Sequence, residues 1–218
     1  MERKPPRRTR ERILALALRL FNDIGEPNVT TSAIADELNI SPGNLYYHFR
    51  NKEDIINALF EQFEREIDPL LDAPMQRAAG FEDAWLFLHL LLESIWRHRF
   101  IYRDLNDLLS RNRRLELHFR TILERKTRAA RALCASLAGP RLAGRTREID
   151  ALATNMVLVA TYWLSYEYVG HARQFNEPAY QSAAMARGAY QVLALLAPHL
   201  DDDGRALLER LADEYLKQ

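Results

Sequence analysis

The stretch from Thr30 to Lys52 constrains the fold most, because it reads as two short helices joined by a tight turn. Thr31 or Ser32 is suited to cap the first helix, whose apolar residues follow at helical spacing. Asn39 tolerates the left-handed backbone that ends a helix, and Ser41 caps a second helix whose first residue is a proline. Two helices separated by so few residues must cross steeply, so the stretch predicts a helix-turn-helix unit.

The second helix of this unit is predicted to expose a polar face. Leu45 and Phe49 are four residues apart and therefore face the core. The outward positions carry two phenols, an imidazole, an amide and a glycine but no carboxylate: Gly43, Asn44, Tyr46, Tyr47 and His48. Such a face offers hydrogen-bond donors and little bulk to a polyanion.

A third helix follows, with Asn51 as its predicted cap and Lys52 in its first turn. A cation at this end opposes the helix dipole, so Lys52 makes sense if a phosphate binds beside it. A solvated lysine without a function is the alternative. The helix that precedes the unit, about Arg8 to Ile24, carries a continuous apolar stripe and is expected to brace it.

These residues resemble the TetR-type transcriptional regulators over about Arg10 to Phe60. The run I-A-D-E-L-N-I-S-P-G-N-L-Y-Y-H-F-R-N-K-E-D-I-I matches the DNA-binding signature of that family without a gap, with L-Y-x-H-F and K-E-x-[LI] at fixed offsets. The resemblance implies that the chain binds a double-stranded DNA operator. The residues at the positions of the family's phosphate contacts are Thr31, Tyr46, His48 and Lys52. The candidates for contact at or near base edges are Ser41, Gly43, Asn44 and Tyr47.

The composition of the 218-residue chain excludes several classes of protein. Hydrophobic residues make up 48%, which is too many for a disordered chain, yet no apolar run reaches membrane-spanning length. The basic start has no apolar segment behind it and is not a signal peptide. The single cysteine, Cys134, excludes internal disulfides and a cysteine-based zinc site, and is expected to be a small buried side chain. A cytoplasmic location is predicted.

The net charge of zero is unusual for a protein that binds DNA, because phosphate contacts supply much of the affinity. The charge is segregated, since residues 1–12 hold six lysines and arginines while Asp201–Asp203 lie near the other end. The basic segment is therefore a candidate arm that touches DNA, with a solvated tail as the alternative.

Helical periodicity continues from Phe81 onward without an alternating strand pattern. The chain is therefore predicted to be all-α, with about nine to ten helices. The predicted parts are an N-terminal arm and three-helix DNA-binding domain (1–52), a connecting helix (53–76) and a helical ligand-binding and dimerisation domain (77–218). Pro69 and Pro74 are expected to interrupt the connecting helix. Later helices are expected over about 81–98, 100–105, 115–137, 148–169, 178–196 and 202–216.

An excess of aromatic residues in the last domain predicts a ligand pocket. The few charges on these helices favour a small apolar or aromatic effector. The predicted lining is Trp85, Leu88, Leu92, Trp96, Phe100, Phe119, Asn155, Tyr162 and Tyr166. Plain core packing is the alternative for many of these residues.

Two segments of this domain, about 147–170 and 178–197, are predicted to form a homodimer interface. The first is apolar on more than one face, which favours one face toward the chain's own core and one toward another chain. The second carries small residues that allow helices to approach closely: Ala183, Ala184, Ala186, Gly188 and Ala189. The resemblance implies that these helices pair with their copies in a four-helix bundle.

The prediction is a homodimeric, ligand-responsive transcriptional regulator that represses from a palindromic operator and is released by a mostly apolar small molecule. An enzyme is disfavoured, because the chain has no nucleophile motif or phosphate loop and its histidines are scattered. No catalytic residue, metal ligand or cofactor is predicted. The alternative is a helical interaction protein of the same fold that does not bind an operator.

Overall fold

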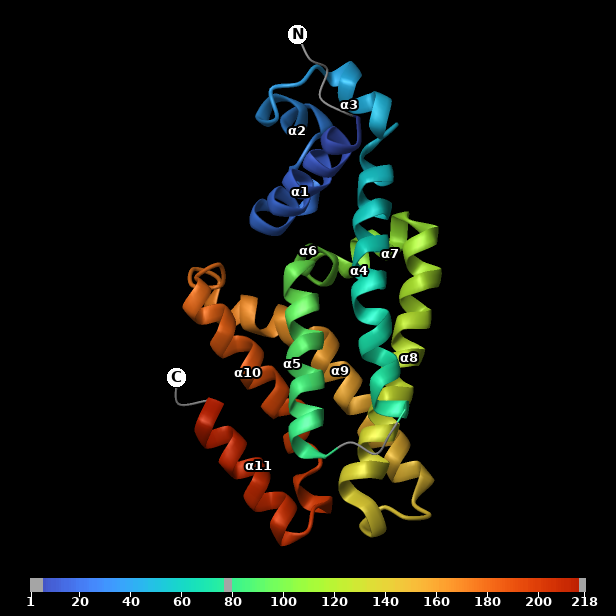
Figure 1. Cartoon of the computed structure of the whole chain (residues 1–218), viewed down its shortest axis with the longest axis vertical. Coiled ribbons are helices and arrows are strands. Elements are labelled where there is room, and N and C mark those ends of the chain that lie inside the picture. Colours follow the sequence, from blue (N-terminus) through green and yellow to red (C-terminus); the bar gives the residue numbers. More distant parts are fainter. Residues whose placement is uncertain (1–5, 77–79, 216–218) are drawn as a thin grey trace. The chain divides into compact units, whose positions relative to one another are not determined.

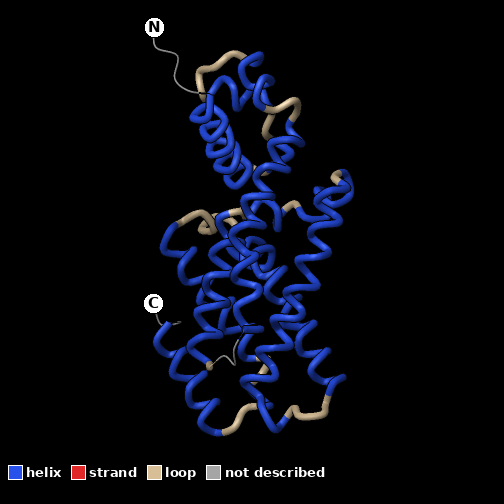
Figure 2. The backbone as a smooth tube through the Cα atoms, turned by 45° about the vertical axis from the view of Figure 1, so that its right-hand side comes forward, coloured by secondary structure: helices blue, strands red, loops and turns tan. Residues whose placement is uncertain are grey.

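The computed structural model describes residues 6–76 and 80–215, and within these ranges the chain is all-α, as predicted (Figure 2). The described residues form eleven α-helices and three short 3-10 helices. One helix more than expected is present, because the short helix predicted near 100–105 is two: α6 (Arg99–Arg103) and α7 (Leu105–Arg111). None of the helices in these ranges has the length and apolar character needed to cross a lipid bilayer.

The chain divides into two compact units. The first unit contains the described residues up to Arg65 together with His98–Leu117, and the second contains Glu66–Arg97 and the described residues from His118. The helices of the first unit are α1 (Pro6–Ile24), α2 (Thr31–Glu37), α3 (Pro42–His48), the start of α4 (Lys52–Gln76), α6 and α7 (Figure 1). The helices of the second unit are α5 (Phe81–Arg97), most of α8 (Arg113–Ala138), α9 (Thr146–His171), α10 (Pro178–Ala194) and α11 (Asp202–Tyr215).

Helix α6 belongs to the first unit because it holds the end of α1. Arg103 donates through Nη2 to the Phe21 carbonyl at 2.7 Å and through Nη1 to the Asn22 carbonyl at 3.1 Å. The Phe100 amide donates to Asn22 Oδ1 at 3.0 Å, and the rings of Phe21 and Phe100 pack 5.3 Å apart. A guanidinium at a helix C-terminus satisfies carbonyls that the helix itself leaves open. The segment His98–Leu117 therefore joins the first unit although it follows α5 in the chain.

The core of the second unit is built on α5, which packs against α10 and α11. Apolar residues recur along its buried face, including Trp85, Leu88, Leu92 and Trp96. Helix α10 also packs against α9, and the two approach closely at Gly188. A Cβ atom added there would lie 2.7 Å from the Trp163 ring and 2.9 Å from Leu92.

The expectation that Pro69 and Pro74 interrupt the connecting helix is wrong, because α4 runs without a break from Lys52 to Gln76. An interior proline costs a helix about 3 kcal/mol. Ile67 and Leu71 are fully buried on either side of Pro69, and each buried side chain of this size contributes about 1.5–3 kcal/mol. Packing therefore offsets the proline, and Arg125 donates to the neighbouring Asp68 carbonyl at 2.9 Å.

Candidate functional site

Side-chain caps fix the two short helices of the predicted helix-turn-helix. The cap of α2 is Thr30, one residue before the predicted Thr31 or Ser32, because Thr30 still has an extended backbone and its hydroxyl accepts from the Ala33 amide at 3.1 Å. Asn39 has the predicted left-handed conformation, with φ of 52°. The Ser41 hydroxyl accepts from the Asn44 amide at 3.2 Å, which confirms Ser41 as the cap of α3.

Helix α3 separates an apolar face from a polar one as predicted. Leu45 and Phe49 are buried. The side of α3 away from them leaves Ser41, Gly43, Asn44, Tyr46 and Tyr47 exposed and His48 half-buried. Tyr47 is 80% exposed, which is unusual for an aromatic side chain that has no partner surface.

Two contacts order the aromatic part of this face. The hydroxyls of Tyr46 and Thr31 share a hydrogen bond of 3.1 Å, which connects α3 to the start of α2. The rings of Tyr47 and His48 meet edge to face with centroids 5.1 Å apart. Both contacts restrict side-chain rotamers before any partner binds, so less conformational entropy is lost on binding.

Gly43 is not required by the packing of the chain itself. A Cβ atom added there would meet only the Ser41 hydroxyl, at 3.9 Å. A helix favours alanine over glycine by up to about 1 kcal/mol, so no neighbour among the described residues accounts for glycine at this position. A surface that approaches α3 closely from outside does account for it.

Lys52 does not point freely toward solvent. Its ammonium forms an ion pair with the buried carboxylate of Glu26 at 2.8 Å, and it donates to the carbonyls of Glu26 and Val29 at 3.0 Å each. The Lys52 side chain is 25% exposed, and Arg111 binds the same carboxylate from α7. The cation thus neutralises a buried acid, which excludes the solvated lysine, whereas the phosphate contact of Lys52 stays a prediction. The predicted cap of α4 is confirmed, since the Asp54 amide donates to Asn51 Oδ1 at 2.8 Å.

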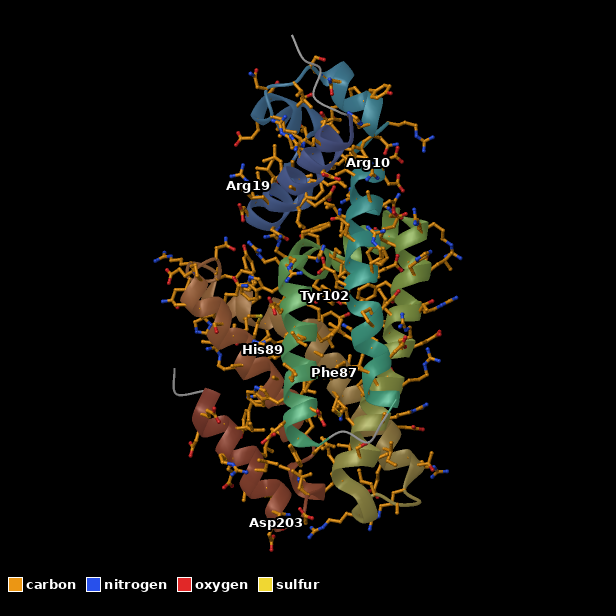
Figure 3. All side chains as sticks on the ribbon, viewed as in Figure 1. Arg10, Arg19, Phe87, His89, Tyr102 and Asp203 are labelled. Carbon is orange, nitrogen blue, oxygen red and sulfur yellow. The ribbon has the colours of Figure 1, made fainter. Side chains whose placement is uncertain are left out.

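Cationic side chains of α1 lie beside this unit. Arg10 is labelled in Figure 3. Its guanidinium carbon lies 5.0 Å from the centroid of the Phe49 ring, a cation–π contact. Arg8 and Arg12 lie on the same helix and are exposed. Residues 1–5 of the predicted basic arm lie outside the described residues.

The nine residues predicted to line a ligand pocket have different surroundings in the structure, and the pocket itself stays a prediction. Asn155, Tyr162 and Tyr166 lie on an exposed stripe of α9, because positions 155, 162 and 166 share one side of the helix that faces away from the core. Phe100 belongs to the first unit and packs against Phe21. The other five are core residues: Trp85, Leu88, Leu92, Trp96 and Phe119. Among them Leu88 lines a cavity, and Trp96 stacks on Phe175 with ring centroids 4.5 Å apart.

The second unit encloses a small cavity of about 20 Å³, which is room for about one water molecule. Its lining comes from α4, α5, α8, α9 and α10: Leu71, Phe87, Leu88, Leu91, Lys126, Ala130, Leu133, Met156, Val157, Ala160 and Val192. Lys126 is the one charged residue of this lining. It is 3% exposed, and its ammonium lies 3.4 Å from the Thr161 hydroxyl.

Sequence reasoning missed Lys126, although a signal was present. Its position lies on the buried stripe of α8, four residues after Ile122 and four before Ala130. A lysine at such a position is buried with its charge, and here burial lowers the pKa of Lys126 to about 7. Nearby Cys134 is buried as predicted, and burial raises the pKa of its thiol to about 11.

Helix α9 also carries an apolar surface. Leu158, Tyr162, Tyr166 and Val169 recur along one side, and Val169 is 83% exposed. A shallow groove runs beside them between α9 and α10, lined by Val159, Tyr162, Trp163, Tyr166 and Gln191. The small residues of α10 serve a different purpose, since Ala184, Ala186, Gly188 and Ala189 are buried within the chain.

In the described part of the chain, no group of three or more His, Cys, Asp or Glu side chains is placed to hold a metal ion.

Comparisons with known proteins match two consecutive segments of the chain. The family model described as bacterial regulatory proteins of the tetR family matches residues 13–59, and the model described as bacterial transcriptional repressor matches residues 62–208. The tetracycline repressor protein class C of Escherichia coli is 40% identical over 52 residues. That match spans 24% of this chain and 24% of the relative, so the chain aligns with about a quarter of its length.

Solved structures extend the similarity to the whole chain. A TetR-family transcriptional regulator from Marinobacter aquaeolei VT8 is 36% identical, with a TM-score of 0.82 over 95% of this chain and 98% of the other. A protein described as a gamma-butyrolactone receptor is 20% identical, with a TM-score of 0.65 over 97% and 98% of the two chains. The second comparison shows the fold alone.

Proposed function

Because the chain belongs to the TetR family of bacterial transcriptional regulators, we propose that it is a homodimeric repressor that leaves its operator when an apolar effector binds. The observation that carries this proposal is the polar face of α3. That face presents hydroxyl, imidazole and amide groups without a carboxylate, on a helix that Ser41 caps and Leu45 anchors. A polyanion is the partner that such a surface fits.

Within this face we propose two kinds of DNA contact. Asn44 and Tyr47 are the candidates for base edges, with Ser41 beside them and Gly43 allowing the backbone to come close. The candidates for phosphate contact are Tyr46, Thr31 and His48. The hydroxyls of Tyr46 and Thr31 already share a hydrogen bond. Lys52 is left out of the proposed interface, because its ammonium is held by Glu26.

We propose that the dimer forms through α9 and α10, with the exposed stripe of α9 at its centre. Leu158, Tyr162, Tyr166 and Val169 form a continuous apolar strip of the kind that a second copy covers. A two-fold axis through such an interface makes the same residues meet their own copies. A two-fold symmetric dimer carries two copies of α3, so its expected operator is a palindrome of two half-sites.

Release by an effector is proposed to pass along the chain from α5 to α6. Helix α5 ends at Arg97 and α6 begins at Arg99, whose neighbours Phe100 and Arg103 bind the end of α1. An effector that favours one position of α5 therefore biases the segment that holds α1. The proposed result is a shift toward dimers whose two α3 helices no longer match successive major grooves.

Selection from a pool of random DNA duplexes tests the proposal. We expect the wild-type chain to enrich a palindrome, and the double variant N44A/Y47A to enrich nothing while melting at the same temperature. A reporter gene placed behind the enriched site is expected to lose transcription when the chain is expressed. No enriched sequence at low salt would support the alternative, a helical interaction protein of this fold that does not bind an operator.

A further inference from the structure

The carboxylate of Glu26 is completely buried in the short 3-10 turn η1 (Glu26–Asn28), between α1 and α2. Two cations reach it from helices that are distant in the sequence: Lys52 at the start of α4, at 2.8 Å, and Arg111 at the end of α7. Asp107 pairs in turn with Arg111 at 2.8 Å, so opposite charges alternate along four side chains. All four side chains belong to the first unit.

Stability alone does not account for an acid at this position. Moving charges out of water is costly, and apolar side chains of similar size often stabilise a core as well as a buried ion pair does. Charged hydrogen bonds differ from apolar contacts because they require defined directions and distances. The Glu26 carboxylate therefore fixes where η1 lies relative to α4 and α7. Its backbone adds to this, since the Glu26 amide donates to Asp104 Oδ2 at 3.3 Å.

The turn that Glu26 holds leads directly into the helix-turn-helix. Lys52 donates to the carbonyls of Glu26 and Val29 at 3.0 Å each, so the same ammonium holds the backbone at both ends of the turn. The next residue, Thr30, is the cap of α2. The ion pairs of Glu26 therefore set the point at which α2 starts.

The first residue of α2 is Thr31, whose hydroxyl shares the hydrogen bond of 3.1 Å with Tyr46 of α3. We propose that Glu26 is a positioning residue for this hydroxyl pair: its carboxylate, held by Arg111 of α7, sets the start of α2 and with it the place of Thr31 and Tyr46 on the DNA-binding face. This inference rests on the proposed function, because the pair is among its candidates for phosphate contact. The buried Glu26 acts through these hydroxyls and does not itself contact DNA.

A positioning role predicts a pattern of loss that differs from the loss of a direct contact. Two neutral hydroxyls at phosphates contribute to affinity on every sequence, so their displacement weakens all duplexes alike and leaves the base preference unchanged. Loss of a base-edge contact relaxes the preference at one position instead. Loss of a cation at a phosphate lowers the salt slope by about one, whereas displacement of neutral hydroxyls does not.

Glu26→Gln and Arg111→Met each break the link between α7 and η1 with little change in size. We expect each variant to bind a selected operator about fivefold to thirtyfold more weakly, the equivalent of one or two hydrogen bonds, with base preference and salt slope unchanged. The double variant E26Q/R111M should lose little more than either single variant, because both changes break the same link. Arg111→Lys keeps the cation and should bind within about threefold of wild type.

The matched control is Arg113→Met, which removes an exposed arginine that pairs with Glu116 in the same unit. It should change none of these quantities. Affinities are measured well below the melting temperature of each variant, so that a loss of stability alone does not lower them. If Glu26→Gln does not fold, Arg111→Met and its rescue by Arg111→Lys give the same comparison.

Amide hydrogen exchange without DNA tests the link separately from the operator. The amides at the start of α2, that of Ala33 among them, should exchange at least about threefold faster in Arg111→Met than in wild type, while those of α9 should not change. Faster exchange in a protein that selects no DNA sequence would leave the link standing and remove the proposed function.

Four results would overturn the inference. Arg111→Met would leave the exchange of α2 or the affinity for a selected operator unchanged. It would relax the preference at one base position. It would lower the salt slope, which would make Arg111 itself a phosphate contact. Arg113→Met would weaken binding equally.

Discussion

Helices α3 and α9 both expose tyrosines, yet the surroundings of Tyr46 and Tyr47 differ from those of Tyr162 and Tyr166 and point to different partners. Tyr46 and Tyr47 on α3 stand beside an amide, an imidazole and a glycine. Tyr162 and Tyr166 on α9 stand beside Leu158 and Val169. In the proposed function the same phenol donates a hydrogen bond to a charged surface in one place and supplies apolar area in the other.

The two surfaces therefore differ in how salt should affect them. Binding through α3 releases counterions from DNA, so its affinity falls steeply as salt rises. The proposed association through α9 depends on the apolar area removed from water, which salt weakens little. Operator affinity depends on both surfaces, because two copies of α3 must act together.

Leu158→Glu is expected to have the largest effect on operator binding. A carboxylate at the centre of the α9 surface must be desolvated when two copies meet, and the two-fold axis places it close to its own copy. We expect a monomer in light scattering and a loss of operator affinity of about a hundredfold or more. Binding to a single half-site should not change.

The control is Leu117→Glu, which puts the same charge on an exposed leucine of α8. It should remain dimeric. A dimeric Leu158→Glu variant would show that α9 is not the interface. The exposed Tyr162 and Tyr166 would then have to bind a partner other than a second copy of the chain.

Asn44→Ala is expected to be next in size and to act only on α3. Loss of a paired amide at a base edge should cost about 1–3 kcal/mol of operator binding and relax the preference at one position of each half-site. The measurement is a fluorescence titration with operator duplexes altered one base pair at a time. Asn106→Ala, at an exposed amide of α7, is the control. An equal loss on every sequence would assign Asn44 to the DNA backbone instead.

The α3 surface was predictable from sequence because its structure is local. Ser41, Asn39 and the spacing of Leu45 and Phe49 determine which residues of α3 face outward, and all of these act within one turn of the chain. The role of Lys52 was not predictable in this way. Its partner, Glu26, is 26 positions away, and only the fold brings the two together.

The helices of the second unit were predictable from the sequence, but the surroundings of their side chains were not. Aromatic content predicted a pocket, yet Tyr162 and Tyr166 are exposed and Trp96 packs on Phe175. Which face of an apolar helix is buried depends on its neighbours, and α9 has apolar residues on both faces. The cavity was marked instead by a single charge on the buried stripe of α8, which a search for aromatic residues does not detect.

Lys52→Met tests whether Lys52 contacts a DNA phosphate or only forms an ion pair within the chain. With the ammonium removed, Glu26 keeps Arg111 but loses one buried partner, so we expect a loss of about 1–3 kcal/mol in the free energy of unfolding. The salt dependence of operator binding should keep its slope, whereas loss of a phosphate contact lowers the slope by about one. The double variant E26Q/K52M should cost less than the sum of the two single changes, because both remove the same pair.

Gly43→Ala is expected to change stability least, and in the direction opposite to its effect on binding. Among the described residues the added methyl group would meet only the Ser41 hydroxyl, at 3.9 Å, and alanine favours a helix over glycine by up to about 1 kcal/mol, so the melting temperature should stay or rise. Operator binding should weaken, because the methyl group keeps the α3 backbone away from the DNA.

Gly188→Ala is the contrast: its methyl group would collide with Trp163, so it should destabilise the fold by about 1–3 kcal/mol. One glycine is then explained by a partner outside the chain and the other by a neighbour within it, and unchanged operator binding in Gly43→Ala would remove the first explanation.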